Sequence, residues 1–259
     1  MKKFPAPLIA LTVIFVSSCQ KNDELLLEQR NPRAPLKQTC QISQISYSIG
    51  STNDVLQLTY NSFGNPVKAS RLLGAHTGYS NFAFKYDGEN RLTDFIGPYD
   101  GETFAESWHK YFYDGKGNIV LDSAYIFPRI ENGFPENAYS RQLTYYTYDN
   151  KDRIIKDSTV FSIPIPPVVH IYAYDNKGNK MGSSYDDKVN INRTNNIWMF
   201  LNRDYSINNP FKADGYTATG LPTSLNLSSK QGVFTFLNNN YPISQIRYSC
   251  DGRNSTGNY

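Results

Sequence analysis

The sequence of 259 residues has few of the residue types that carry catalysis and metal binding. It contains three cysteines, three histidines and two tryptophans, and charged residues make up only 19% of it. The motifs HExxH, GxSxG and CxxC and the Walker loop are all missing. The formal net charge of +3 gives no support for nucleic-acid binding, which usually needs a clustered basic face. We therefore expect a protein with no catalytic residues, cofactor or metal, which does not bind nucleic acid.

Aromatic and amide side chains are abundant instead. Aromatic residues are 14% of the chain, and the 26 asparagines equal the lysines and arginines combined. This composition argues against a disordered chain, which has few aromatics, and against a coiled coil, which needs a majority of Ala, Glu, Lys, Leu and Arg. It is typical of β-strands joined by tight turns.

The first residues have the pattern of an export signal. Lys2 and Lys3 precede an apolar run from Leu8 to Val16 that is interrupted only by Thr12. A run of this length is too short to span a bilayer as an anchor helix. We predict a cleaved signal peptide over residues 1–18.

The segment that follows resembles a lipoprotein cleavage site. Val16-Ser17-Ser18-Cys19 is similar to a bacterial lipobox, in which the cysteine is lipidated and becomes the new N-terminus. An ordinary secretory peptide with an incidental cysteine is the alternative. Gln20 to Glu24 resembles the acidic signal that sends lipoproteins of Bacteroidota to the cell surface. The resemblance implies an outer-membrane anchor at Cys19 and exposure at the cell surface, with the periplasmic face as alternative. Residues 19–38 would be a tether before a single domain over 39–259.

Two cysteines remain in the mature chain. Cys40 begins an alternating strand pattern, CQISQISYS, and Cys250 ends another, ISQIRYSC. Antiparallel neighbours bring the start of one strand beside the end of the other, and an exported protein meets an oxidising compartment. We predict a disulfide between Cys40 and Cys250, with two free buried thiols as the alternative.

One pattern recurs five times along the chain. Each copy has an aromatic residue, then Asp or Asn, a polar turn, and Asn or Arg before an apolar strand. The copies are YNSFGNPV, YDGENRLT, YDGKGNIV, YDNKDRII and YDNKGNKM, starting at Tyr60, Tyr86, Tyr113, Tyr148 and Tyr174. The starts are 26, 27, 35 and 26 residues apart, and a degenerate sixth copy begins at Phe236. Such spacing indicates a repeated structural unit.

Each copy has the pattern of a β-hairpin. Before the turn, apolar and aromatic residues recur at every second position, as in Phe82, Phe84 and Tyr86, which places them on one face of a strand. The Asp or Asn can accept a hydrogen bond from the backbone two residues on. Four turn glycines allow a positive φ: Gly88, Gly115, Gly117 and Gly178. Adjacent hairpins would align the five tyrosines in a ladder of cross-strand contacts.

These copies resemble the YD repeats of the RHS family, and the mature chain resembles Bacteroidota surface lipoproteins that carry such repeats. The resemblance covers roughly Gln41 to Lys180. We predict an all-β fold, an antiparallel meander of hairpins that forms one large twisted or curled sheet of some twelve to fourteen strands. RHS proteins wind many repeats into a shell around a toxin. This chain has too few repeats for a shell, so that function is not implied.

One region, 186–214, lacks the alternating pattern. Ile197 to Leu201 is an apolar run that contains Trp198, and we expect a short helix that caps an open end of the sheet. The alternative is an exposed aromatic insertion that contacts a ligand or partner. Ser206 to Ala213 is expected to be a loop.

Candidate contact residues are sought outside the repeat, because the ladder accounts for the repeated tyrosines. Exposed aromatic faces stack on sugars or anchor protein interfaces, which makes Trp108, Phe134 and Trp198 the candidate ligand contacts. His109 and His170 each precede a repeat tyrosine by four residues and are expected to be ordinary sheet residues.

The leading hypothesis is a non-catalytic surface lipoprotein that binds a glycan, peptide or partner protein. A second is a structural subunit of an outer-membrane complex that pairs through a sheet edge. A third is a lipid-anchored hydrolase, because a carboxylate pair can meet in space without being adjacent in sequence. Ser123 and Ser158 lie in Asp-Ser-Ala and Asp-Ser-Thr triplets, which resemble the O-glycosylation site of exported Bacteroidota proteins.

Overall fold

The structure is a computed structural model that describes residues 40–49, 52–101, 103–211, 243–250 and 253–258. The predicted signal peptide, the lipidation site at Cys19 and the tether lie outside these residues, as does the start of the sixth repeat copy at Phe236.

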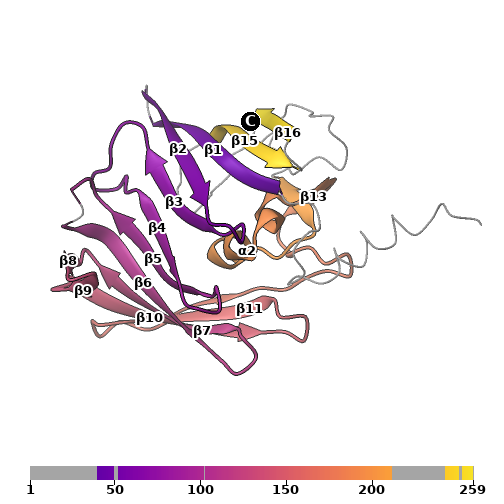
Figure 1. Cartoon of the computed structure of the whole chain (residues 1–259). Coiled ribbons are helices and arrows are strands. Elements are labelled where there is room, and N and C mark those ends of the chain that lie inside the picture. Colours follow the sequence, from indigo (N-terminus) through magenta and orange to yellow (C-terminus); the bar gives the residue numbers. More distant parts are fainter. Residues whose placement is uncertain (1–39, 50–51, 102, 212–242, 251–252, 259) are drawn as a thin grey trace, which may run out of the picture.

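Twelve strands of the described part form one antiparallel sheet (Figure 1). Their order across the sheet is β12-β11-β10-β7-β6-β5-β4-β3-β2-β1-β15-β16. They are β1 (Cys40–Ile49), β2 (Thr52–Tyr60), β3 (Pro66–Arg71), β4 (Phe82–Tyr86), β5 (Leu92–Pro98), β6 (Ala105–Tyr113), β7 (Ile119–Ile126), β10 (Ser140–Tyr148), β11 (Ile154–Phe161), β12 (Val168–Ile171), β15 (Ile243–Cys250) and β16 (Arg253–Asn258). From β1 to β12 spatial neighbours follow the chain order, which confirms the predicted all-β meander.

The five repeat turns share one hydrogen-bond pattern. In the turn after β4, the carboxylate of Asp87 accepts bonds from the N–H groups of Glu89 at 3.0 Å and Arg91 at 2.9 Å. The same pair of bonds, at 2.8–3.0 Å, ends on Asn61, Asp114, Asp149 and Asp175 in the other turns. The predicted turn role of this position is therefore confirmed.

The positive φ of each turn lies three residues after that Asp or Asn, at Gly64, Asn90, Gly117, Asp152 and Gly178. The prediction of a positive φ is correct for Gly117 and Gly178. It is wrong for Gly88 and Gly115. Each directly follows the aspartate, two residues before the position at which the turn has its positive φ. Asn and Asp take the left-handed position in two copies, because their short polar side chains tolerate it.

The repeat tyrosines tie each hairpin to the one before it. The hydroxyl of Tyr113 donates to the carbonyl of Leu92, the first residue of the preceding return strand, at 2.8 Å. The equivalent bonds run from Tyr60 to Ile42, from Tyr86 to Pro66, from Tyr148 to Ile119 and from Tyr174 to Ile154, at 2.5–3.3 Å. The tyrosines therefore have the predicted structural role, but they join the hairpins through their hydroxyl groups.

The large sheet curls around the short helix α2 (Asn196–Leu201), as Figure 1 shows. Trp198 meets Phe84 edge-on at 5.6 Å between ring centres, and Phe200 meets Tyr111 at 5.3 Å and Tyr146 at 5.2 Å. Residues 197–201 are all buried. A sheet this wide tends to curl, and the helix supplies the core of its inner face. The predicted helix is confirmed, but it fills the inside of the curl instead of capping an open end.

The insertion also contains strands that the sequence did not indicate. β13 (Ser184–Val189) pairs with β14 (Asn208–Phe211), and the 3-10 turn η1 (Ile191–Thr194) precedes α2. The expected loop is therefore wrong over Asn208–Phe211. The β13–β14 register shifts between Tyr185 and Val189, and such an irregular ladder has no alternating sequence pattern. A separate hairpin joins β8 (Arg129–Glu131) to β9 (Phe134–Glu136).

Cys40 and Cys250 occupy paired positions on β1 and β15. Cys40 is 4% exposed. The antiparallel pairing inferred from the two flanking patterns is thus present, and the disulfide between the two residues stays a prediction.

Candidate functional site

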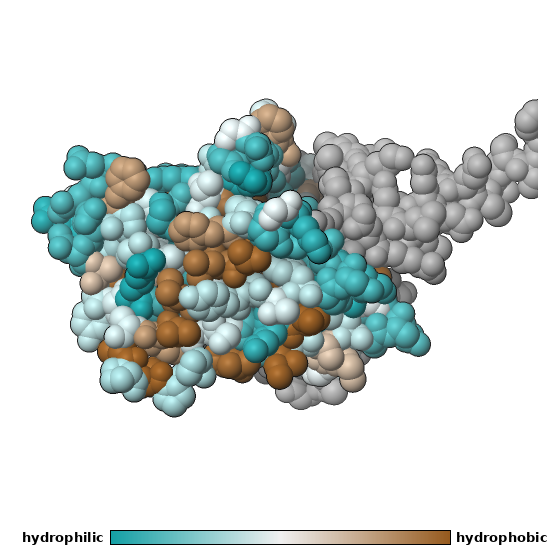
Figure 2. Space-filling view, turned by 90° about the horizontal axis from the view of Figure 1, so that it is seen from below, coloured by the Kyte–Doolittle hydropathy of each residue, from teal (hydrophilic) through white to brown (hydrophobic). Residues whose placement is uncertain are grey.

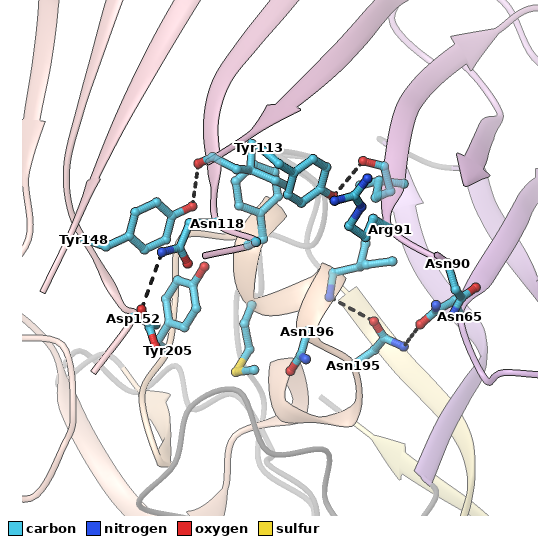
Figure 3. A pocket seen from close by; sticks show the side chains of 16 residues that line it. Asn65, Asn90, Arg91, Tyr113, Asn118, Tyr148, Asp152, Asn195, Asn196 and Tyr205 are labelled. Carbon is cyan, nitrogen blue, oxygen red and sulfur yellow. Dashed lines mark hydrogen bonds between the residues drawn. The ribbon is translucent and has the colours of Figure 1, made fainter. Parts of the chain in front are cut away.

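A pocket of about 460 Å³ lies between the row of repeat turns and helix α2 (Figure 3). One wall comes from the turns after β2, β4, β6 and β10, and the other comes from α2 and the segment after it. Its asparagines are Asn65, Asn90, Asn118, Asn195 and Asn196, and its tyrosines are Tyr113, Tyr148 and Tyr205. The volume lies within the roughly 300–1,000 Å³ that is usual for ligand sites.

Asn195 fixes the helix against the first repeat turn. Its side-chain oxygen caps α2 by accepting a bond from the N–H of Ile197 at 2.9 Å. Its amide nitrogen donates to the carbonyl of Gly64 and to Oδ1 of Asn65, both at 3.0 Å. Asn is a preferred N-cap residue, and here one side chain both starts the helix and joins the two walls of the pocket.

Side-chain amides also connect neighbouring turns. Asn118 is 7% exposed, and its Nδ2 donates to Asp152 of the next turn at 3.4 Å and to Asp114 of its own turn at 3.5 Å. Asn61, at a different position of the first turn, donates through its Nδ2 to Oδ1 of Asn90 in the second turn at 3.4 Å. The wall formed by the turns is therefore held together by polar side chains that face the pocket or adjoin it.

The positive charge in the wall is balanced within its own turn. The guanidinium of Arg91 lies 2.8 Å from the carboxylate of Asp87 and 3.2 Å from that of Glu89. It also lies 5.1 Å from the centre of the Tyr113 ring. The backbone N–H of Arg91 is the main cause that holds the pKa of Asp87 below its ordinary value. Asp152 is the negative residue among those that line the pocket.

The tyrosine rings are held in fixed orientations. The hydroxyls of Tyr113 and Tyr148 donate to backbone carbonyls at 2.8 Å and 2.7 Å, and burial raises the pKa of Tyr113 to about 12, so its hydroxyl stays a donor near neutral pH. The pocket therefore offers fixed aromatic surfaces beside amide groups. In the described part of the chain, no group of three or more His, Cys, Asp or Glu is placed to hold a metal ion.

Two of the three predicted ligand contacts are buried. Trp108 is 1% exposed, donates its indole N–H to Asp94 at 2.6 Å, and has the Lys85 ammonium 4.5 Å from its ring centre. Trp198 is 0% exposed inside the curl. The prediction is wrong for both, because residues of the preceding strands cover Trp108, and the inner face of the curled sheet covers Trp198.

Phe134, the third predicted contact, is 58% exposed on β9 and lies outside the pocket. The ammonium of Lys110 lies 5.8 Å from its ring centre. Phe134 remains a candidate contact residue, separate from the pocket.

The two serines of the predicted O-glycosylation triplets differ in burial. Ser123 on β7 is 1% exposed, and its hydroxyl accepts a hydrogen bond from Arg141 at 2.9 Å. The folded chain therefore does not present Ser123 for modification, which corrects the prediction there. Ser158 on β11 is half-buried, and its modification stays a prediction.

Each of the two strand histidines pairs with an aspartate of the neighbouring strand. Nδ1 of His109 lies 2.8 Å from Asp122, and Nδ1 of His170 lies 2.7 Å from Asp157. Both histidines are thus sheet residues, as expected, and both have a buried carboxylate as partner.

The pocket was not predicted from the sequence, because the repeat turns were assigned a structural role alone. A signal was present in the fifth residue after each repeat tyrosine, which is always Asn or Arg: Asn65, Arg91, Asn118, Arg153 and Asn179. Three of these five line the pocket. A polar side chain kept at one position of every copy indicates a row of similar groups along one edge of the sheet.

In the part of the chain that the structure describes, no helix has the length and apolar character needed to cross a membrane. No family model and no curated protein matches the sequence.

Solved structures show a weak similarity. The structure titled TcdB2-TccC3-TEV has 14% identity and a TM-score of 0.26 over 78% of this chain and 10% of that one. TcdB2-TccC3-Cdc42 has 12% identity and a TM-score of 0.27 over 83% of this chain and 13% of that one. TcdB2-TccC3 without its hypervariable C-terminal region has 13% identity and a TM-score of 0.26 over 80% and 13%. The chain spans about a tenth of the length of these proteins, and such scores do not assign it to a family.

Proposed function

We propose that this chain is a lipid-anchored, non-catalytic protein of the outer membrane that binds a ligand in the pocket beside its repeat turns. The pocket carries the proposal, because four successive turns and α2 build one concave site of ligand size with amide and aromatic walls. The predicted anchor at Cys19 would hold this site at the cell surface, or at the periplasmic face in the alternative. A glycan, a peptide or a segment of a partner protein could occupy it.

A variant that fills the pocket tests this function. Asn196 is exposed, lines the pocket and is the first residue of α2, so Asn196→Trp adds bulk without replacing the cap at Asn195. Lys177→Trp is the matched control, since Lys177 is exposed in a repeat turn but does not line the pocket.

The mature chain is applied to arrays of glycans and peptides. We expect hits that Asn196→Trp loses and Lys177→Trp retains. An array without hits, or hits that persist in Asn196→Trp, would contradict the proposed site. Anchoring is tested separately, because labelled fatty acid should be incorporated into the wild type and not into Cys19→Ala.

A second candidate function, assembly through a sheet edge, is favoured by strand β12. It is the last strand on one side of the described sheet, and Val168, Val169 and Ile171 are 42%, 47% and 80% exposed. An exposed edge strand can pair with a strand of another chain. Figure 2, which views the molecule from below, shows apolar side chains scattered among polar ones on that face. The cross-strand row of paired residues that contains Val169 also includes Phe112 and Tyr145, which are 47% and 49% exposed.

This alternative predicts complexes that depend on β12. Cross-linking of wild-type cells should give adducts that Ile171→Lys loses. Phe63→Lys, at an apolar residue that is 75% exposed in the first repeat turn, should retain them. Recovery of wild-type monomer alone would contradict assembly through this edge.

A further inference from the structure

We propose that the ligand of the turn pocket is a neutral saccharide of one to three rings, held by the asparagine amides of the repeat turns. This inference rests on the proposed function, since it names the ligand class of the same pocket. It depends on which polar groups of the wall still have hydrogen-bonding capacity, on how the charges are balanced, and on the direction of the aromatic rings.

Three asparagines keep unused capacity within the described residues. Asn65 accepts from Asn195 through Oδ1, and Asn90 accepts from Asn61 through Oδ1, while the Nδ2 of neither has a partner in the described part of the chain. Asn118 has the opposite arrangement, because its Nδ2 donates to two carboxylates and its Oδ1 accepts no bond from a described residue.

The pocket thus combines donors with an acceptor, all of them uncharged. A sugar hydroxyl both donates and accepts, so a ligand with several hydroxyls can satisfy such a mixed set. A polar group that is buried without a partner costs roughly 1–3 kcal/mol, which a matching ligand hydroxyl avoids. This chemistry favours a hydroxyl-rich molecule over an apolar one.

The charges of the wall favour a neutral ligand. The guanidinium of Arg91 is bound to Asp87 and Glu89 at 2.8 and 3.2 Å, so an anion would have to compete with two carboxylates that are already in place. Asp152 accepts a bond from Asn118 at 3.4 Å. An acidic saccharide would bring a second negative charge beside Asp152, while Arg91 is already paired with two carboxylates.

The aromatic rings and the shape of the wall favour a saccharide over a peptide. Figure 3 shows the rings of Tyr148 and Tyr205 beside the amide of Asn118. A sugar ring can lie against such a face with its apolar C–H groups while its hydroxyls reach the amide. Peptides in extended form usually add to a free strand edge, whereas this wall consists of turns.

The repeat also places equivalent groups at intervals. Asn65 and Asn118 occupy the same position in the first and third copies, and successive turns are two strand spacings apart, about 9–10 Å before curling. An oligosaccharide has hydroxyl groups along its whole length, so one ligand can contact more than one turn.

The test uses titration calorimetry on the mature chain with defined probes. The neutral probes are maltotriose, cellotriose and xylotriose, the acidic probe is trigalacturonate, the cationic probe is the glucosamine trimer, and a tripeptide set represents peptides. Asn65→Asp and Asn90→Asp keep the Oδ1 acceptor and remove the Nδ2 donor. Asn132→Asp is the matched control. Asn132 has a positive φ of 50°, similar to the 61° of Asn90, but it is exposed in the β8–β9 hairpin, outside the pocket.

We expect at least one neutral trisaccharide to bind wild type and Asn132→Asp alike, and to bind each pocket variant about 3- to 10-fold more weakly, the effect of one lost hydrogen bond. Tightest binding of the acidic or cationic probe or of a peptide, if lost in Asn196→Trp, would overturn the neutral-saccharide inference and leave the proposed function standing. Absence of binding by every probe would overturn the inference. If the arrays also gave no hits, the proposed function would fail with it.

Discussion

The hydroxyl of Tyr113 donates a 2.8 Å hydrogen bond to the carbonyl of Leu92, and every described copy of the repeat contains the equivalent bond. This bond joins the last residue of one outgoing strand to the preceding hairpin, close to its turn. It therefore ties each turn to the one before it. Because the turns form one wall of the pocket, the same bond links the architecture of the sheet to the candidate binding site.

Removal of one such hydroxyl should destabilise the sheet. Tyr86→Phe loses the 2.5 Å bond to the carbonyl of Pro66 and leaves that acceptor without its partner. We expect a loss of about 1 kcal/mol in the free energy of unfolding, measured by urea denaturation as a lower midpoint at unchanged slope. Tyr139→Phe is the control, since Tyr139 is 87% exposed. Equal midpoints for the two variants would show that the hydroxyl bond contributes nothing.

Stability should fall at alkaline pH because of the buried tyrosines. Burial raises the pKa of Tyr113 and Tyr248 from 10.0 to about 12. A group whose pKa is raised in the folded state binds more protons there than in the unfolded state, so its contribution is complete below pH 10 and is lost as pH rises from about 10 to about 12. Urea midpoints between pH 8 and 12 should decline over that window. A flat profile up to pH 12 would contradict the role assigned to burial.

Replacement by alanine should lower the free energy of unfolding more at the glycine of the fifth turn than at a glycine that has space around it. Gly178 has φ +87°, and a Cβ there would lie 2.7 Å from Cδ1 of Ile207. Gly133 has φ +78° with nothing within 4 Å of a Cβ, so it shares the backbone strain and not the clash. Gly133→Ala should cost roughly 1–2 kcal/mol. Gly178→Ala should cost about 1 kcal/mol more in the same denaturation experiment. An equal cost for the two variants would show that the Ile207 side chain moves away from the new Cβ without loss of stability.

The paired positions of Cys40 and Cys250 allow a direct test of the predicted disulfide. Unfolded, unreduced protein should take up no alkylating reagent at these residues, as read by intact mass, and reduction should expose both. Loss of the bridge in Cys40→Ser should lower the free energy of unfolding by roughly 2–5 kcal/mol, the range for native disulfides. Two labelled thiols before reduction would exclude the bridge.

Local chemistry in the repeat predicted much of the fold. The Asp or Asn after each tyrosine forms its turn bonds with residues two and four positions on, so short-range sequence was sufficient for the hairpins and the meander. The flanks of Cys40 and Cys250 likewise indicated the antiparallel pairing of β1 with β15. These features depend on neighbours in sequence or on simple alternation.

Features that depend on curling could not be predicted in the same way. Trp198 was a candidate contact because it is an aromatic residue outside the repeat. The curl of the sheet brings Phe84 against it and leaves it 0% exposed. The pocket requires Asn195 to meet Asn65 at 3.0 Å, a contact between residues 130 positions apart. Neither the secondary-structure propensity of these residues nor their spacing in the sequence predicts that contact. It arises from the width of the sheet and the position of the helix inside it.

The row of repeat turns and helix α2 are proposed to form one ligand site. A crystal structure of the mature chain with a neutral trisaccharide from the titration panel tests it most directly. We expect a sugar ring seated between the turn after β6 and α2, with hydroxyls within hydrogen-bond distance of Asn90 Nδ2 or Asn118 Oδ1. A sugar bound elsewhere, such as beside Phe134 or along β12, with the turn pocket empty would contradict it.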